Sequence, residues 1–161
     1  MGYLQELDAL GRWVFSVAKL KSHRLSAAPP QVARPVILWE GPTRTKGENL
    51  GRYHFTRKTS QYGVLYVSNL DQLADLMDKL EKDLGDRDEW LPIFETDQPN
   101  AVQVGKLRKV QIEFNTTQAV NIPIIIRYEV TYSRPTPVKA PAAVSVGNKI
   151  KLGGGQVDSS Q

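Results

Sequence analysis

The chain has 161 residues, of which 40% are hydrophobic and 24% are charged, and this fits one domain of ordinary size with a real core. It contains no cysteine, which excludes disulfides, thiolate catalysis and zinc sites built on sulfur. The net charge is +4, but the cations are scattered along the chain, which is more typical of a solvated surface than of a nucleic-acid footprint. No apolar run approaches transmembrane length, and charged residues interrupt the N-terminal apolar pattern. We therefore expect a soluble protein, without a signal peptide, that stays in the cell that makes it.

The first predicted element is an amphipathic helix from about residue 3 to residue 21. Acidic residues lie in its early turns and lysines in its last turn, which suits the helix dipole. Pro29 and Pro30 follow and cannot continue a helix. The apolar residues of this helix recur every three or four positions: Leu4, Leu7, Leu10, Val14, Val17 and Ala18.

Three strands are predicted next. Residues 36–40 form a short apolar strand that Gly41 and Pro42 close, and residues 41–51 form a polar loop. Residues 52–58 and 62–68 are predicted as two strands of a hairpin joined through the sequence TSQ.

A second helix is predicted over residues 70–84. Ser68 or Asn69 caps its start, with Asp71 or Gln72 three residues later as in a capping box, and Gly85 ends it. The helix must lie on a sheet, because each buried leucine of its stripe contributes about 1.5–3 kcal/mol. The stripe consists of Leu70, Leu73, Leu76, Met77, Leu80 and Leu84.

Two closing strands are predicted as an antiparallel pair, residues 107–114 and 122–132, after a connection with an apolar patch at residues 90–94. The order predicts an α+β fold with a mostly antiparallel sheet of about five strands, in β-β-β-α-β-β order, packed by an N-terminal helix and one central helix. Residues 1–133 form one domain. Residues 134–161, rich in proline and glycine, are expected to form an extended or disordered C-terminal arm.

The residues that carry chemistry in other proteins do not form a recognisable set. His23 and His54 lack further ligands at metal-binding spacing, and the acidic cluster of residues 83–89 lacks the ligand pattern of a calcium loop. In the stretch GPTRTKGENLG, Lys46 precedes Gly47 and Glu48 follows, which is the wrong order for a phosphate-binding loop. We expect no catalytic residue, no cofactor and no metal, and therefore not an enzyme.

Residues 34–135 resemble the tail terminator (tail completion) proteins of long-tailed bacteriophages in the order of their predicted elements and in the amino-acid pattern of these segments. The segments that carry the resemblance are RPVILWE, GRYHFTRKTSQYGVLYVSN, LDQLADLMDKLEKDL, WLPIFE, GKLRKVQIEF and IPIIIRYEVTYSRP.

This resemblance implies a structural virion protein of the tail-neck region, assembled in the host cytoplasm. It implies a homo-oligomeric ring, usually of six subunits, that sits on the last ring of the tail tube protein and stops tube polymerisation. The ring would join the head connector (stopper) protein and, in contractile tails, contact the sheath protein. Genomic DNA would pass through its lumen without sequence-specific binding.

The strand of residues 122–132 is expected to belong to the sheet that a subunit presents to its neighbours, with subunit packing as one way to cover its edge. Assembly contacts are expected in the loop 41–51 and in the arm, although plain solvent exposure remains the alternative for both. The residues are Arg44, Lys46, Glu48 and Asn49 in the loop, and Arg134, Lys139, Lys149 and Lys151 in the arm.

Two other functions remain open. Another head–tail connector, such as a stopper or head-completion subunit, would share the ring but contact the portal. A small nucleic-acid-binding α+β module would use RYHFTRK and the basic tail, and its binding would weaken with salt.

Overall fold

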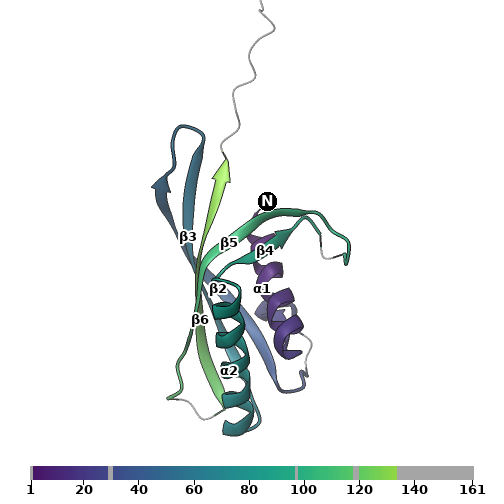
Figure 1. Cartoon of the computed structure of the whole chain (residues 1–161). Coiled ribbons are helices and arrows are strands. Elements are labelled where there is room, and N and C mark those ends of the chain that lie inside the picture. Colours follow the sequence, from purple (N-terminus) through teal and green to yellow (C-terminus); the bar gives the residue numbers. More distant parts are fainter. Residues whose placement is uncertain (1, 29–30, 97, 118–119, 134–161) are drawn as a thin grey trace, which may run out of the picture.

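The computed structural model describes residues 2–28, 31–96, 98–117 and 120–133, which form an α+β fold with two α-helices and one curled sheet (Figure 1). The predicted fold class and both predicted helices are confirmed. The elements are α1 (Tyr3–Ala18), β1 (Lys21–Arg24), a 3-10 turn η1 (Leu25–Ala27), β2 (Val36–Asn49), β3 (His54–Tyr66), α2 (Leu70–Asp86), β4 (Leu91–Phe94), β5 (Gln103–Phe114) and β6 (Asn121–Ser133).

The sheet contains six strands in the order β1-β2-β3-β6-β5-β4, rather than about five. The β1–β2 pair is parallel and the other four pairs are antiparallel, so the sheet is mixed but mostly antiparallel as predicted. The predicted C-terminal arm lies outside the described residues.

Helix α1 ends at Ala18, three residues before its predicted end. Lys19 takes a left-handed conformation, φ 54°, and its N–H donates to the carbonyl of Phe15 at 2.9 Å, which closes the last turn. The chain then enters β1, whose sequence KSHR has no apolar alternation and was not predicted as a strand.

The hairpin consists of β2 and β3, rather than of residues 52–58 and 62–68, and its strands are longer than predicted. Strand β2 continues through the expected loop to Asn49, so the prediction of a loop at residues 41–51 is wrong. Gly41 and Pro42 lie at a register shift beyond the end of β1, and proline is tolerated at bulges and sheet edges. The predicted break at TSQ is also wrong, because residues 59–61 pair with β2 on one side and β6 on the other.

Helix α2 begins as predicted. The Asn69 side chain accepts a hydrogen bond from the Gln72 amide at 2.8 Å, and the Gln72 side chain accepts one from the Ser68 amide at 2.7 Å. Gly85 does not end the helix, which continues to Asp86. Of the predicted apolar stripe, Leu73, Leu76, Leu80 and Leu84 are buried, Met77 is partly buried, and Leu70 is 70% exposed.

Strands β5 and β6 form the predicted antiparallel pair. The preceding apolar patch is itself a strand, β4, which pairs with the first half of β5. From Ile124 to Glu129, strand β6 pairs with β3 on one side and β5 on the other, so the expectation that subunit packing covers its edge is wrong for this part of the strand. Beyond Glu129, the described part of β6 pairs with β3 alone.

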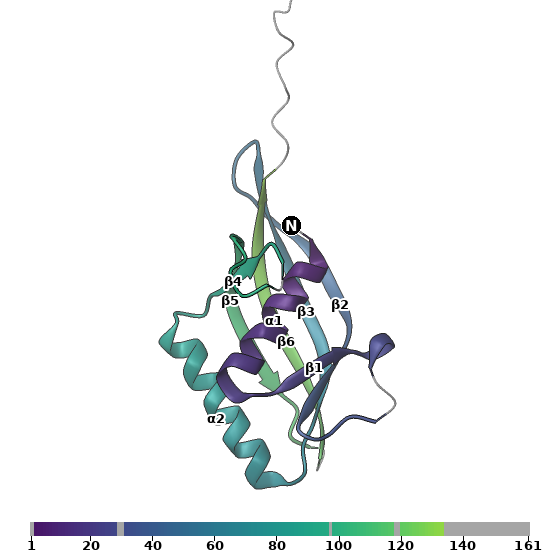
Figure 2. The same ribbon diagram turned by 90° about the vertical axis from the view of Figure 1, so that its right-hand side faces the viewer.

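Both helices lie on the same face of the sheet, with α1 between α2 and β1 (Figure 2). The predicted packing of α2 on a sheet is therefore confirmed. Trp13 on α1 donates through Nε1 to the carboxylate of Asp83 on α2 at 2.7 Å, which joins the two helices. Strand β6 contributes alternate side chains to the core beneath them: Ile122, Ile124, Ile126, Tyr128 and Val130.

Candidate functional site

The face of the sheet turned away from the helices is open: no helix of the described residues covers it (Figure 1). One end of this open face is apolar. The strand register places Tyr62 opposite Ile125, and Val64 between Leu38 and Pro123, so these side chains are cross-strand neighbours. All of them are half-buried, as side chains are on a sheet face that only its own neighbours shield.

The other end of the open face is polar and charged. Arg127 pairs with Glu113 at 2.8 Å, and Lys109 lies 3.7 Å from Glu129. Lys58 has no ion-pair partner among the described residues. A shallow hollow of about 360 Å³ lies among these side chains, with Thr43, Thr45 and Ser60 also at its wall.

Three strands continue past the helices as a ribbon, formed by the ends of β2 and β6 and the start of β3 (Figure 1). Phe55 pairs with Asn49 on one side and with Tyr132 on the other, and the rings of Phe55 and Tyr132 stack at 5.7 Å. This ribbon, and not a loop, carries three of the predicted contact residues: Lys46, Glu48 and Asn49.

The predicted contact residues of β2 point in different directions. Lys46, Glu48 and Asn49 are exposed near the end of the strand. Arg44 points inward, and its side chain is 19% exposed because it forms an ion pair with Glu6 at 3.2 Å. The other four predicted contacts, Arg134, Lys139, Lys149 and Lys151, lie outside the described residues.

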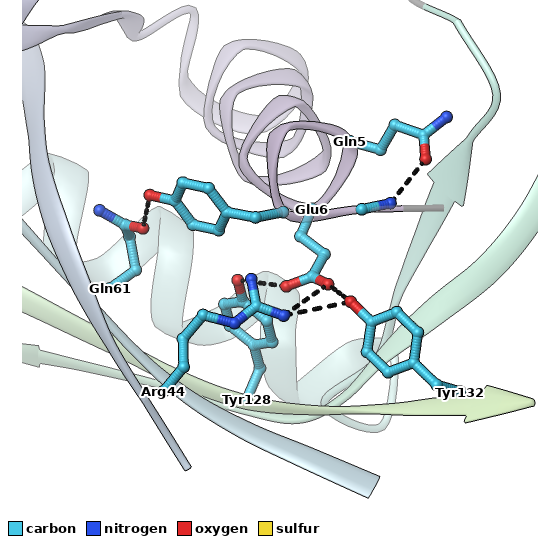
Figure 3. A network of polar contacts seen from close by, with 8 residues as sticks. Gln5, Glu6, Arg44, Gln61, Tyr128 and Tyr132 are labelled. Carbon is cyan, nitrogen blue, oxygen red and sulfur yellow. Dashed lines mark hydrogen bonds and ion pairs between the residues drawn. The ribbon is translucent and has the colours of Figure 1, made fainter. Parts of the chain in front are cut away.

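The inward end of Arg44 belongs to a buried polar cluster under the start of α1 (Figure 3). Glu6 is fully buried, and its Oε1 accepts a hydrogen bond of 3.0 Å from the hydroxyl of Tyr128. Its Oε2 accepts from Arg44 and from the hydroxyl of Tyr132, and Arg44 also donates to that hydroxyl at 3.1 Å. One carboxylate therefore fastens α1 to both β2 and β6.

A second contact of the same helix lies beside this cluster. The hydroxyl of Tyr3 donates to the side-chain oxygen of Gln61, a fully buried residue of β3, and the Gln61 amide donates to the carbonyl of Glu40 at 2.6 Å. The Arg44 guanidinium lies over the Tyr3 ring at 5.3 Å. The first turns of α1 are thus held to β2, β3 and β6 by polar groups.

Burial raises the pKa of the two tyrosines that join α1 to the sheet, Tyr3 and Tyr128. It raises the pKa of Tyr128 far above its ordinary value of 10.0, and the nearby Glu6 carboxylate raises it further. Burial also raises the pKa of Tyr3, against the opposing effect of its hydrogen bond to Gln61. Both hydroxyls stay protonated and act as hydrogen-bond donors at neutral pH.

The sequence interpretation did not predict that Glu6 is buried, although its position in the helix indicated this. A charged residue next to Leu7 and one turn before Leu10 lies on the apolar side of the helix, where a carboxylate needs a partner. The identity of the partners had no local signal, because Arg44 and Tyr128 come from strands far along the chain.

The histidines and acidic residues are dispersed. His23 lies on β1 and His54 begins β3, with β2 between these strands. Across residues 2–28, 31–96, 98–117 and 120–133, no three His, Cys, Asp or Glu side chains are grouped so that they could hold a metal ion. None of the helices in this part of the chain has the length and apolar character needed to cross a membrane.

Comparison with models of known protein families gave no match, and comparison with curated proteins gave none either.

Proposed function

We propose that this protein is a structural virion subunit of the tail-terminator type, which forms a ring on the tail tube, stops tube polymerisation and provides the surface for the head connector. The open face of the sheet is the observation that carries this proposal. A sheet covered by helices on one side, with half-buried Tyr62, Val64 and Ile125 on the other, offers a wide surface for protein contacts.

The charged groups of the interior support a structural protein over an enzyme. The Glu6 carboxylate is occupied by Arg44 and by the hydroxyls of Tyr128 and Tyr132, and the raised pKa of Tyr128 makes this hydroxyl a poor proton donor in acid–base chemistry at neutral pH. The cluster uses its polar groups to hold α1 in place.

The ribbon supports the same proposal. Strands β2, β3 and β6 extend past the helices (Figure 1), and Lys46 and Glu48 near the end of β2 are exposed, so this part of the sheet can contact other subunits.

Native mass spectrometry of the full chain at micromolar concentration, with and without a short DNA duplex, tests the proposal. We expect a closed ring, six copies being the usual number, whose mass distribution the duplex does not change. A monomer that binds the duplex in low salt and releases it in high salt would overturn the proposal in favour of a nucleic-acid-binding module.

A monomer that ignores the duplex would be mixed with assembled tail tubes and with isolated portal rings. Binding to tube ends, with arrest of tube growth, supports a terminator whose ring closes on the tube. Binding to the portal alone would indicate a stopper or head-completion subunit. Failure to bind either would overturn the proposal.

A further inference from the structure

A hollow of about 720 Å³ opens on the helical face between α1 and β1, distinct from the open face of the sheet. Leu7 and Trp39 line its buried part, and Phe15, which is 49% exposed, lies at its side. An apolar floor with an exposed aromatic side chain is typical of a surface that a protein segment covers.

The charges around this hollow are mainly positive. Arg12, Lys21 and Arg24 line it, against the single carboxylate of Asp8. Lys21 and Arg24 are exposed and form no ion pair within the described residues, so their charges are available to a partner. Arg12 lies on α1, whereas Lys21 and Arg24 lie on β1, and the position of β1 beside α1 brings the three cations together at the hollow.

Helix α2 presents the opposite charge. It carries six carboxylates and two lysines, and the lysines pair within the helix with Asp75 and Asp86. Asp71, Asp78 and Glu81 are exposed and form no ion pair within the described residues. Leu70, which is 70% exposed at the start of the helix, adds an apolar contact to this acidic surface.

The hollow and the acidic surface of α2 lie at opposite sides of the same face. The hollow adjoins β1, at one edge of the sheet, whereas α2 lies on the side of β5, with α1 between them (Figure 2). Two complementary surfaces on opposite sides of one subunit form a head-to-tail contact, and such contacts close into rings when the rotation between subunits is suitable.

We propose that the acidic face of α2 docks into the α1–β1 hollow of a second copy of this chain, and that this is the contact that joins neighbouring copies. This inference rests on the proposed ring-forming function and specifies its interface. Asp78 and Glu81 of one copy meet Lys21 and Arg24 of the next. The open face of the sheet is thereby left for the other partners of the assembly.

A second copy suits the hollow better than a nucleic acid does. A phosphate backbone that extended beyond the hollow on the side of α1 would approach the carboxylates of α2, which would repel it. Asp8, within the hollow itself, would also repel a phosphate. A helix with acidic side chains and an exposed leucine matches both the cations and the aromatic side chain.

Charge reversal in two matched variants of the full chain tests this contact. The first variant is Lys21→Glu with Arg24→Glu in the hollow, and the second is Asp78→Lys with Glu81→Lys on α2. Each alone places like charges across the contact, so we expect the concentration needed for ring formation to rise roughly tenfold or more. Circular dichroism checks that both variants keep the fold.

Mixing the two variants provides the decisive measurement. Neither variant pairs with itself, but each surface of one matches the opposite surface of the other. With one variant labelled with ¹⁵N, we expect native mass spectrometry to show rings with equal numbers of both chains, three of each in a ring of six. The chain that carries all four reversals should form rings again by itself.

Lys58→Glu with Arg108→Glu is the control. Both residues are strand partners of Glu129 on the open face, so the same charge change falls outside the contact and should leave the ring intact. Salt provides a second readout, since roughly 0.5 M NaCl should weaken the wild-type ring strongly. Rings that survive both reversals, or that only the control variant disrupts, would overturn the interface and leave the proposed function standing. If the wild-type chain stays monomeric at low salt, the two single-surface variants are tested on assembled tail tubes, and arrest of tube growth by either variant as strong as that by the wild type would overturn the interface and leave the proposed function standing.

Discussion

The hydroxyl of Tyr128 donates a 3.0 Å hydrogen bond to the carboxylate of Glu6, across 122 residues of chain. The same carboxylate forms an ion pair with Arg44, so the first helix, the edge of the hairpin and the last strand meet at one fully buried group. A buried ion pair adds little net stability compared with an apolar replacement, but removing one partner leaves the other charge uncompensated. Substitution of Glu6 should therefore lower the stability of the fold strongly.

Replacing Glu6 with alanine should destabilise the protein strongly. The substitution leaves Arg44 largely buried without its counter-charge and removes the acceptor of the Tyr128 hydroxyl, so we expect a loss of about 3 kcal/mol or more in the free energy of unfolding. Urea denaturation measures this loss. Asp8→Ala, on the exposed side of the same helix, should change the stability by about 0.5 kcal/mol or less. Equal urea midpoints for the two variants would show that the cluster does not hold α1.

Stability should fall at alkaline pH because of Tyr128. The folded protein raises the pKa of this hydroxyl above its ordinary value of 10.0, so above about pH 10 the unfolded chain loses the proton while the folded chain keeps it. The resulting stabilisation is present below pH 10 and is lost progressively as the pH rises further. Urea midpoints measured between pH 8 and pH 11 should therefore fall less steeply for Tyr128→Phe than for the wild type. Tyr62→Phe on the open face is the matched control and should keep the wild-type slope.

The leucines of α2 should differ sharply in their contribution to stability. Leu80 is fully buried, so Leu80→Ala should cost about 2–5 kcal/mol through lost apolar contact and the cavity left behind. Leu70 is 70% exposed, so Leu70→Ala should change stability by about 0.5 kcal/mol or less. Thermal unfolding of both variants tests the difference, and comparable losses would mean that the start of α2 is packed against the core.

A side chain added at Gly63 should destabilise the protein, in contrast to one added at Gly85. A Cβ at Gly63 would lie 3.0 Å from the Trp39 ring and 3.1 Å from the carbonyl of Leu38, so Gly63→Ala should cost about 1–3 kcal/mol. Gly85 lies inside α2 with nothing within 4 Å of an added Cβ, so Gly85→Ala should stabilise the protein by about 0.5–1 kcal/mol. Chemical denaturation should move the two midpoints in opposite directions. A shift in the same direction would contradict the close packing of Trp39 on β3.

The elements predicted correctly are those specified by residues that lie close together in the sequence. Helix α2 has its cap at Asn69 and its buried leucines within one continuous stretch, and β5 and β6 carry their own alternation next to each other. The errors fall where a distant strand supplies the hydrogen bonds. Thr59–Gln61 were predicted as a turn, but they pair with β6 and β2. Gly41 and Pro42 were predicted to end a strand, but β2 continues past them because β3 continues beside it.

The candidate surfaces also depend on residues that are distant in the sequence. The sequence showed an excess of cations scattered along the chain, but it gave no sign that Lys21 and Arg24 would meet Arg12 at one hollow. Strand β1 brings them to the hollow beside α1, and the packing of α1 separates this hollow from α2. Arg44, predicted as an exposed contact, is drawn inward by Glu6.

The sequence by itself determined the fold class, the two helices and the closing strand pair, because backbone periodicity, helix capping and turn chemistry act over a few residues. The tertiary structure alone decided the order of the six strands, the length of the β2–β3 hairpin and the burial of Glu6 between α1, β2 and β6. These features depend on hydrogen bonds and ion pairs between residues tens of positions apart, and such pairings are settled only when the whole chain packs together.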